Sequence, residues 1–460
     1  TKKVHRITDK YLGKITETGF VPAQKRVQMI SEHLTVTVKE FGASAMITHV
    51  GQNVISCLKD AYPNDWKAIF SFAALRFICN SPLKNLAYQF KHSCLAEFVG
   101  DADLEPKKAS ELLARIGSDR ERMVRFMKSL YVPSSENLVI DITAILSSSE
   151  NINWLSLSRT PEDSFHPLVN LLLIFSNNRM RPTYFRLLPG VIKDVSSVRE
   201  TINESGIKNA VFIGDKAFFS EDNIEKLEHE KLQYILPVKR NSAYVNYDTI
   251  KKSDRKSFDG YFIHEKRHVW YKDTTSNALK AKNRHTFLFF DERLRTEEEM
   301  SLLNRAESTP HAKVEEKKQL LSKFYESQYA LGTITILTNT NEPARKVYSF
   351  LKSRVNIELS FDTFKNILEA DRTYMRTTEH LHGWMFINYL SLLLYYELYG
   401  LLVEGDLLNH YSPKDIVLHF SRVYHINLSS GKVISEIPKR VTELGKKLKF
   451  PENLLLNQRS

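Results

Sequence analysis

Hydrophobic residues in the first part of the chain recur at three- and four-residue intervals, which is the spacing of amphipathic helices. The pattern predicts helices over residues 65–80, 82–99 and 107–132. Near residue 137 it changes to short apolar runs rich in β-branched residues, which is typical of buried strands. We therefore expect a helical N-terminal region over residues 1–130, followed by a region of mixed α/β structure.

The segment from 131 to 239 alternates short apolar runs with two amphipathic stretches. Strands are predicted over residues 137–146, 166–176, 181–190, 209–214 and 233–239, and helices over residues 194–206 and 220–230. The order is β-β-β-α-β-α-β, in which three antiparallel strands precede two parallel crossovers. Right-handed crossovers bring the first strand next to the fourth. This order is the RNase H-like pattern, so we expect residues 131–239 to form the first part of such a domain.

Residues 240–333 interrupt this pattern. The stretches 257–273 and 284–294 are strand-like, and a charged helical stretch follows at 296–325. A strand over 334–340 and a long helix over 343–368 then resume the earlier pattern. The predicted fold class is α/β: an RNase H-like catalytic domain completed by residues 334–405, with a β-rich insertion over 240–333 and a C-terminal basic region over 406–460.

The stretch from Trp384 to Val403 is long and apolar enough to suggest a membrane span. It contains Asn388 and Glu397 and has no basic flank, and a charge in mid-span is costly in lipid. We therefore predict a buried core helix and expect no membrane partner.

The overall composition adds a partner class. Lys and Arg outnumber Asp and Glu by 65 to 54, which gives a net charge of +11 and favours a polyanion, either nucleic acid or an anionic membrane face. The three cysteines form no C-x-x-C pair and no zinc-ligand spacing. This usage indicates a reducing compartment rather than a disulfide framework, so a cytoplasmic location is expected.

Two aspartates stand at positions where an α/β protein places chemistry. Asp141 lies in the middle of an apolar strand, where a charge is costly unless it is paired or metal-bound. Asp215 directly follows the strand over 209–214, and the carboxyl ends of such strands open into ligand-binding clefts. Each has a structural alternative, because Asp141 could be hydrogen-bonded near a strand end and Asp215 could cap a turn or helix.

A third carboxylate lies on the long helix. At 100° per residue, Glu358 shares an arc of about 60° with Leu351, Arg354 and Lys365. Apolar residues surround this arc, which indicates a polar cleft more than open solvent. The alternative is an ordinary solvated face of an amphipathic helix.

Together these residues resemble a known family. The pattern Y-x2-R-x3-E-x6-K is the signature helix of DDE transposases of the insertion-sequence-four type, and this sequence matches it at Arg354, Glu358 and Lys365. Leu351 stands where the pattern has Tyr, and Tyr348 lies one turn earlier. The family's two aspartates match Asp141 in LVIDIT and Asp215 in FIGDKAFFS, and the β-rich insertion is also a family trait. The resemblance covers about residues 105–405.

The resemblance implies a function and a metal site. Asp141, Asp215 and Glu358 would be the catalytic carboxylates, with Asp141 bridging two Mg²⁺ or Mn²⁺ ions and the other two each holding one. Carboxylates are the ligands that these hard cations prefer. Arg354 and Lys365 would bind phosphates near the scissile bond, and Tyr348 could supply the missing ring.

Further DNA contacts are expected in and beside the insertion. Residues 251–285 carry ten Lys and Arg against four Asp and Glu, and Trp270 lies among them. Family members that form hairpin intermediates stack a Trp of this insertion on a flipped base; the alternative is a Trp that packs within its own subdomain. Lys239 and Arg240, where the chain enters the insertion, are further candidates for phosphate contact.

The function expected from the resemblance is cut-and-paste DNA transposition in a prokaryotic cytosol or nucleoid. The partners would be the transposon's terminal inverted repeats and target DNA, bound by a homodimer. The N-terminal helices would either contact DNA or serve dimerisation. Two alternatives remain at this point: a catalytically silent DNA-binding protein of the same fold, and a host nuclease that hydrolyses without strand transfer.

Overall fold

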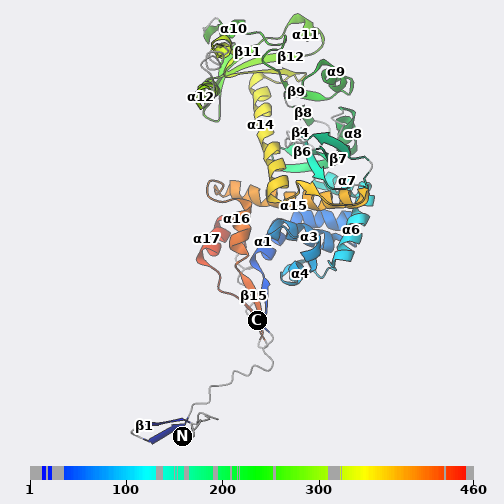
Figure 1. The fold of residues 1–460 in the computed structure, drawn as a ribbon, viewed down its shortest axis with the longest axis vertical. Coiled ribbons are helices and arrows are strands. Elements are labelled where there is room, and N and C mark those ends of the chain that lie inside the picture. The colour runs from blue at the N-terminus through cyan, green and yellow to red at the C-terminus, as the bar shows by residue number, and fades with distance from the viewer. Residues whose placement is uncertain are drawn as a thin grey trace, which may run out of the picture.

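The computed structural model describes a large α/β molecule (Figure 1). The residues it describes are 13–16, 19–22, 36–130, 138–149, 151–152, 154–159, 165–189, 195–207, 210–214, 216, 218–251, 255–308, 322, 324–428 and 431–451.

Helices dominate residues 42–130, as predicted. They are α1 (Gly42–Val50), α2 (Gln52–Ala61), α3 (Trp66–Cys79), α4 (Leu86–Lys91), α5 (Leu95–Val99), α6 (Pro106–Ser118) and α7 (Arg120–Leu130). Before them lie the paired strands β1 (Gly13–Thr16) and β2 (Gly19–Pro22), and the strand β3 (Thr37–Glu40).

Two of the predicted helices are broken by contacts that periodicity does not reveal. The expected helix over 82–99 is interrupted because the backbone of β3 pairs with it: the Glu40 amide donates to His92 and the Cys94 amide donates to Glu40. The expected helix over 107–132 is divided at Asp119, whose carboxylate accepts from the Arg122 amide and so caps α7.

The central sheet has the predicted order of strands and helices, with one additional short strand, β5, between the first two predicted strands. Its elements are β4 (Leu138–Ser147), β5 (Ser156–Arg159), β6 (Phe165–Ser176), β7 (Arg181–Pro189), α8 (Val195–Ser205), β8 (Ala210–Ile213), α9 (Glu221–His229) and β9 (Gln233–Pro237). In space the order is β7-β6-β4-β8-β9, in which the β7–β6 and β6–β4 pairs are antiparallel and the β4–β8 and β8–β9 pairs are parallel. The first strand therefore lies between the second and fourth, which is the RNase H-like arrangement that the sequence predicted.

The insertion extends this same sheet and does not form a separate one. It contains α10 (Asp248–Lys251), β10 (Gly260–His264), β11 (Arg267–Asp273), α11 (Asn277–Ala281), β12 (His285–Asp291) and α12 (Glu292–Ser308). The strand β13 (Thr333–Thr338) pairs with β9 on one side and β12 on the other, and β12, β11 and β10 continue antiparallel to the edge. Most of the helical stretch predicted beyond Ser308 lies outside the described residues.

The long helix α14 (Ala344–Asp362) crosses one face of this sheet and contacts strands from β9 to β7. Figure 1 shows it on one side of the strands, with α8 and α9 on the other. It ends in a π-helical turn over Thr363–Ile367, and the short strand β14 (Arg372–Thr373) then pairs in parallel with the end of β4.

The apolar helix α15 (Thr378–Glu404) lies between the sheet and the N-terminal helices (Figure 1). It is the one described helix long and apolar enough to cross a membrane, and 72% of its apolar window is buried inside the protein. Its polar residues have partners there, because Asn388 accepts from Arg76 and Glu397 pairs with Arg181. This placement agrees with the predicted core helix, which is apolar all round because protein surrounds it.

The C-terminal segment folds back onto the N-terminal helices. It forms α16 (Pro413–Phe420), β15 (Tyr424–Leu428), β16 (Gly431–Ile434) and α17 (Lys439–Lys447). The strand β15 pairs with β3 on one side and β16 on the other, which gives a second, three-stranded sheet.

Candidate active site

Asp141 lies on the central strand β4 at a break in its pairing. The β4–β8 ladder ends with Ile140 opposite Phe212, and the β4–β14 ladder begins only at Leu146. Between these ladders, no described strand pairs with this edge of β4. Asp141 is the first residue of this gap and is 9% exposed, so its carboxylate is almost fully buried.

The helix α14 brings two charged side chains to this aspartate. The Arg354 Nε lies 3.2 Å from Oδ2 of Asp141, and its Nη2 lies 3.4 Å from Oε1 of Glu358. The turn between β6 and β7 holds the helix here, because the Asn177 side chain donates to Ser353 and accepts from Asn356. The predicted carboxylates Asp141 and Glu358 are therefore brought to one guanidinium.

The electrostatics of the site favour a cation. Burial raises the pKa of Asp141 above its ordinary value, and Glu358 acts in the same direction. The Arg354 guanidinium and the Ile142 amide oppose this rise. Glu358 differs from Asp141 in being half exposed, with a side-chain exposure of 51%. The site thus contains one buried and one open carboxylate, with a shared arginine between them.

The third predicted carboxylate, Asp215, lies outside the described residues. The strand that precedes it is well placed, because β8 runs parallel to β4 with Ile213 one step beyond the Ile140–Phe212 pair. The described chain therefore leaves β8 through Gly214 beside the start of the gap at Asp141.

Comparison with known proteins bears on this arrangement. A family model described as a transposase DDE domain matches residues 138–394, more than half of the chain. The chain belongs to the DDE transposase family. The match does not distinguish types within the family, so the insertion-sequence-four type stays a prediction.

Other comparisons add little to the family match. No curated protein matches this transposase. Among solved structures it is similar to a piggyBac transposase synaptic complex with hairpin DNA, with 10% identity and a TM-score of 0.38 over 82% of this chain and 70% of that one. Because this TM-score lies below 0.5, no conclusion rests on the likeness.

Lys365 does not keep the helical position that its spacing predicted. It lies in the π-helical turn, whose i→i+5 hydrogen bonds widen the helix and shift later residues around the axis. The regular 100° step that aligned Lys365 with Arg354 therefore fails over this last turn. Lys365 is partly buried, and burial lowers the pKa of its ammonium, with Asp371 opposing the change.

Tyr348 is not available to DNA in this structure. Its side chain is fully buried, and its ring packs against Phe262, His264 and Phe289 of the insertion. Its hydroxyl lies 3.4 Å from the buried Asp291 carboxylate. The expectation that Tyr348 contacts DNA is therefore not supported by its position, since the ring instead joins α14 to the inserted strands.

The two cations at the start of the insertion differ. Lys239 is exposed, so its side chain is accessible to a phosphate. Arg240 is half-buried, with both carboxylate oxygens of Glu298 within 2.8 Å and the Thr333 carbonyl at 3.0 Å. These contacts indicate a structural role for Arg240 between β9, α12 and β13.

Trp270 packs within the insertion but keeps part of its surface exposed. Its ring lies 5.2 Å from the Tyr261 ring and 5.9 Å from the Phe258 ring, and the Arg255 guanidinium lies 5.6 Å above it. Its indole N–H donates to Glu292. These contacts favour the packing interpretation, and stacking on a base stays a prediction.

Sequence reasoning missed one property of the site. Arg354 was expected to bind phosphate, whereas here it pairs with both carboxylates. The Arg354–Glu358 pair could have been predicted, because residues at i and i+4 are neighbours on a helix. The contact with Asp141 depends on tertiary packing, which the sequence pattern does not show.

Proposed function

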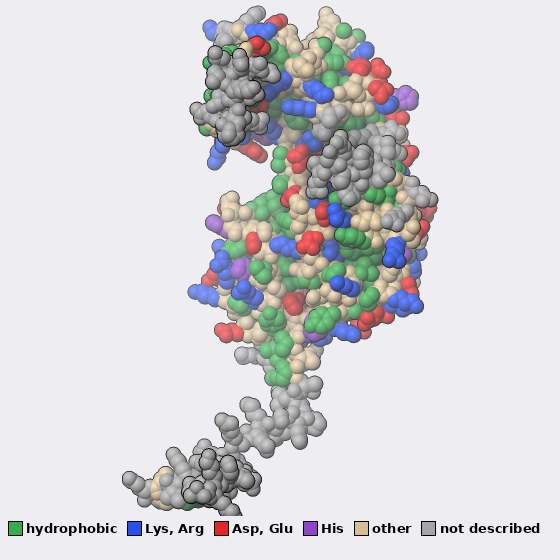
Figure 2. Space-filling model, viewed as in Figure 1, with side chains coloured by type: hydrophobic (Ala, Val, Ile, Leu, Met, Phe, Trp, Pro, Cys, Tyr) green, Lys and Arg blue, Asp and Glu red, His purple; other side chains and the backbone are tan. Residues whose placement is uncertain are grey.

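We propose that this transposase cleaves the ends of its DNA element and joins them to target DNA, with Asp141, Asp215 and Glu358 as the catalytic carboxylates. The observation that carries the proposal is the convergence of Asp141 and Glu358, from distant parts of the chain, on Arg354. The shape of the molecule supports this proposal as well, because its surface is hollowed on the side where α14 lies (Figure 2).

The residues present fit the divalent ions that the family generally uses. The two described carboxylates offer hard oxygen ligands, which suit Mg²⁺ or Mn²⁺. Asp141 is buried with a raised pKa, so a nearby cation would offset the cost of its charge. Two ions held by Asp141, Asp215 and Glu358 would supply an activated water and a stabilised leaving oxygen.

The chain's own side chains would hold the DNA strand. Arg354 offers five N–H donors, of which two now face carboxylates, so it can bind a phosphate oxygen without leaving Asp141. Lys365, in the π-helical turn that follows α14, would neutralise a second phosphate. Lys239 is exposed and would add a contact where the chain enters the insertion.

The decisive experiment compares conservative carboxylate variants. In Mg²⁺, Asp141→Asn, Asp215→Asn and Glu358→Gln are each expected to abolish end cleavage while end binding persists, because binding is spread over many phosphate contacts. Asp362→Asn is the matched control, an exposed carboxylate one turn beyond Glu358 on α14. The proposal fails if a folded variant of the three keeps cleaving at the rate of the control.

A second assay separates transposition from simple hydrolysis. A pre-cut end offered with target DNA should become covalently joined to it by the wild-type protein. A host nuclease would cleave but leave the pre-cut end unjoined, and a catalytically silent DNA-binding protein would do neither.

A further inference from the structure

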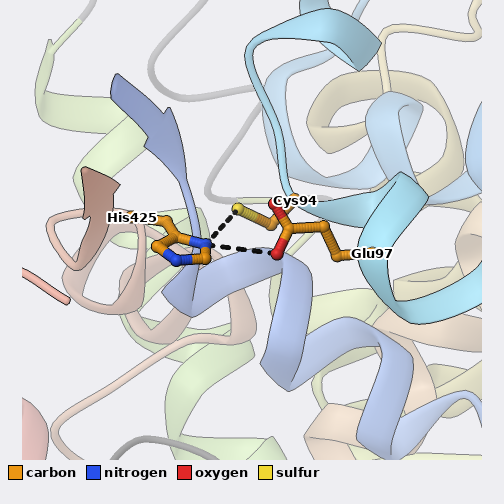
Figure 3. Close-up of side chains that lie close together, drawn as sticks. All are labelled: Cys94, Glu97 and His425. Atoms are coloured by element: carbon orange, nitrogen blue, oxygen red, sulfur yellow. Dashed lines mark hydrogen bonds and ion pairs between the residues drawn. The ribbon is translucent and has the colours of Figure 1, made fainter. Parts of the chain in front are cut away.

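A second group of chemically active side chains lies far from the carboxylates. Within the described part of the chain, Cys94, Glu97 and His425 bring one ligand atom each to within 4.8 Å of one another (Figure 3). Cys94 directly precedes α5, Glu97 lies on α5, and His425 lies on β15. Residues more than 300 positions apart therefore face each other.

The geometry is close to that of a metal site. The His425 Nδ1 lies 3.7 Å from the Cys94 Sγ and 3.2 Å from the Glu97 Oε2. In a tetrahedral zinc site with ordinary bond lengths, sulfur–nitrogen and nitrogen–oxygen edges are about 3.6 and 3.3 Å. Both distances match those edges, and the third pair, the Cys94 sulfur and a Glu97 carboxylate oxygen, lies within 4.8 Å.

The surroundings shield Cys94 and His425 from solvent and limit the movement of the imidazole. Cys94 and His425 are fully buried, whereas the Glu97 side chain is 23% exposed. Among the described residues the buried His425 Nε2 has no hydrogen-bond partner, so the ring's polar contacts there run through Nδ1. The Phe41 ring lies 5.7 Å away, edge to face with the imidazole, and restricts its rotation.

The backbone around the strand β3 positions all three ligands. His425 is paired with Lys39 across the β15–β3 ladder. The next residue, Glu40, accepts from the Cys94 amide at 2.8 Å, so the start of α5 is tied to the same strand. The ligands are therefore held by the fold itself, as a preformed site requires.

We propose that Cys94, Glu97 and His425 bind a structural Zn²⁺ ion. Water would reach the fourth position from the side where Glu97 is exposed. A thiolate with an imidazole selects zinc over Mg²⁺, which prefers oxygen alone, so this site and the carboxylate site take different metals. Zinc binding releases the Cys94 thiol proton to solvent, and the bound ion links β15 to α5.

Without a cation the three side chains would form only a hydrogen-bonded group. Burial raises the pKa of the Cys94 thiol to about 12, so the sulfur would stay protonated at neutral pH. A bound zinc ion reverses this preference, because it deprotonates a coordinating thiol. The two states differ in metal content and can be told apart directly.

The test uses the full chain, purified without chelator and without added metal. Elemental analysis should find about one zinc per chain, and replacement by Co²⁺ should give a sulfur-to-cobalt charge-transfer band in the near ultraviolet. Cys94→Ser should lose both signals, while Cys79→Ser, at an exposed cysteine on α3, should keep them. Zinc affinity should fall by roughly 10-fold or more in Glu97→Gln, which alters the partly exposed ligand and serves if Cys94→Ser does not fold.

The inference is overturned if the wild-type chain is purified without zinc and does not bind added Zn²⁺ in titration. It is equally overturned if folded Cys94→Ser or Glu97→Gln binds zinc as tightly as the Cys79→Ser control. Neither result bears on the carboxylate site, because these measurements need neither DNA nor cleavage.

Discussion

Removing Arg354 should destabilise the protein in a way that depends on pH. In Arg354→Ala, the buried Asp141 carboxylate loses its cationic partner. The Glu358 carboxylate is half exposed, so the loss of its ion pair with Arg354 costs little free energy. Removing one partner of a fully buried ion pair costs about 3–5 kcal/mol. The side chains of Arg354 and Asp141 are 24% and 13% exposed, and solvent screens the pair accordingly. We therefore expect a loss of about 1–3 kcal/mol in the free energy of unfolding at neutral pH.

The direction of the pH dependence follows from the pKa of Asp141. Burial already raises this pKa, and loss of Arg354 raises it further. The folded variant then binds the Asp141 proton more tightly than the unfolded chain, so its stability falls as pH rises from the ordinary value of 3.8 through the raised pKa. The loss relative to wild type should therefore be small at about pH 4 and larger at neutral pH.

Thermal unfolding at these two pH values measures the effect. For a domain of about 150–250 residues, 1 kcal/mol corresponds to a Tm change of about 2–4 °C, so a loss of several degrees is expected at neutral pH. Arg345→Ala, at an exposed arginine on the same helix, is the control for losing a helical cation. Adding Asp141→Asn to Arg354→Ala should recover part of the loss, because the unpaired buried charge at position 141 is then removed. An equal loss at both pH values, or one no larger than that of Arg345→Ala, would refute the reasoning.

Three further predictions concern packing, DNA binding and assembly. Tyr348→Ala should lower the free energy of unfolding by about 3–5 kcal/mol, because the ring is fully buried under the insertion. Tyr348→Phe should keep near wild-type cleavage, and a strong loss of DNA binding in this folded variant would contradict the packing role. Lys365→Ala should slow cleavage and make the log–log salt dependence of end binding shallower by about one unit, and an unchanged slope would remove Lys365 from the DNA contacts. Light scattering of the complex with both ends should give at least two protein chains, because each end needs an active site; a competent single chain would count against a dimer.

Much of the catalytic fold could be predicted because its signals are local. The apolar run at 137–146 and the observed β4 differ by one residue at each end, and apart from the short additional strand β5 the order of elements from β4 to β9 is as expected. Strands buried on both faces give continuous apolar runs, and this local pattern needs no knowledge of partners. The α15 helix was recognisable for the same reason.

What could not be predicted depends on contacts between distant segments. The helix expected over 82–99 breaks because the backbone of β3 forms hydrogen bonds to it. Lys365 leaves the arc that it was expected to share with Arg354 and Glu358 because α14 ends in a π-helical turn. Tyr348 was a candidate for the tyrosine that the signature helix lacks at position 351, yet its ring packs under the insertion. The Cys94, Glu97 and His425 group shows the same limit, since no spacing in sequence relates residues of α5 and β15.

The extended sheet explains why the glutamate comes from so long a helix. The helix α14 starts after β13, which is three strands from β4 in the order β13-β9-β8-β4. At about 4.8 Å between neighbouring strands, the helix must cross about 14 Å to reach Asp141. With a rise of 1.5 Å per residue, Arg354 lies about 15 Å and Glu358 about 21 Å beyond Ala344. Arg354 is thus among the first positions that can reach β4, and Glu358 lies one turn further over the open gap. The strand β13, which follows the insertion, thus sets where this helix begins and so which of its residues meet the aspartate.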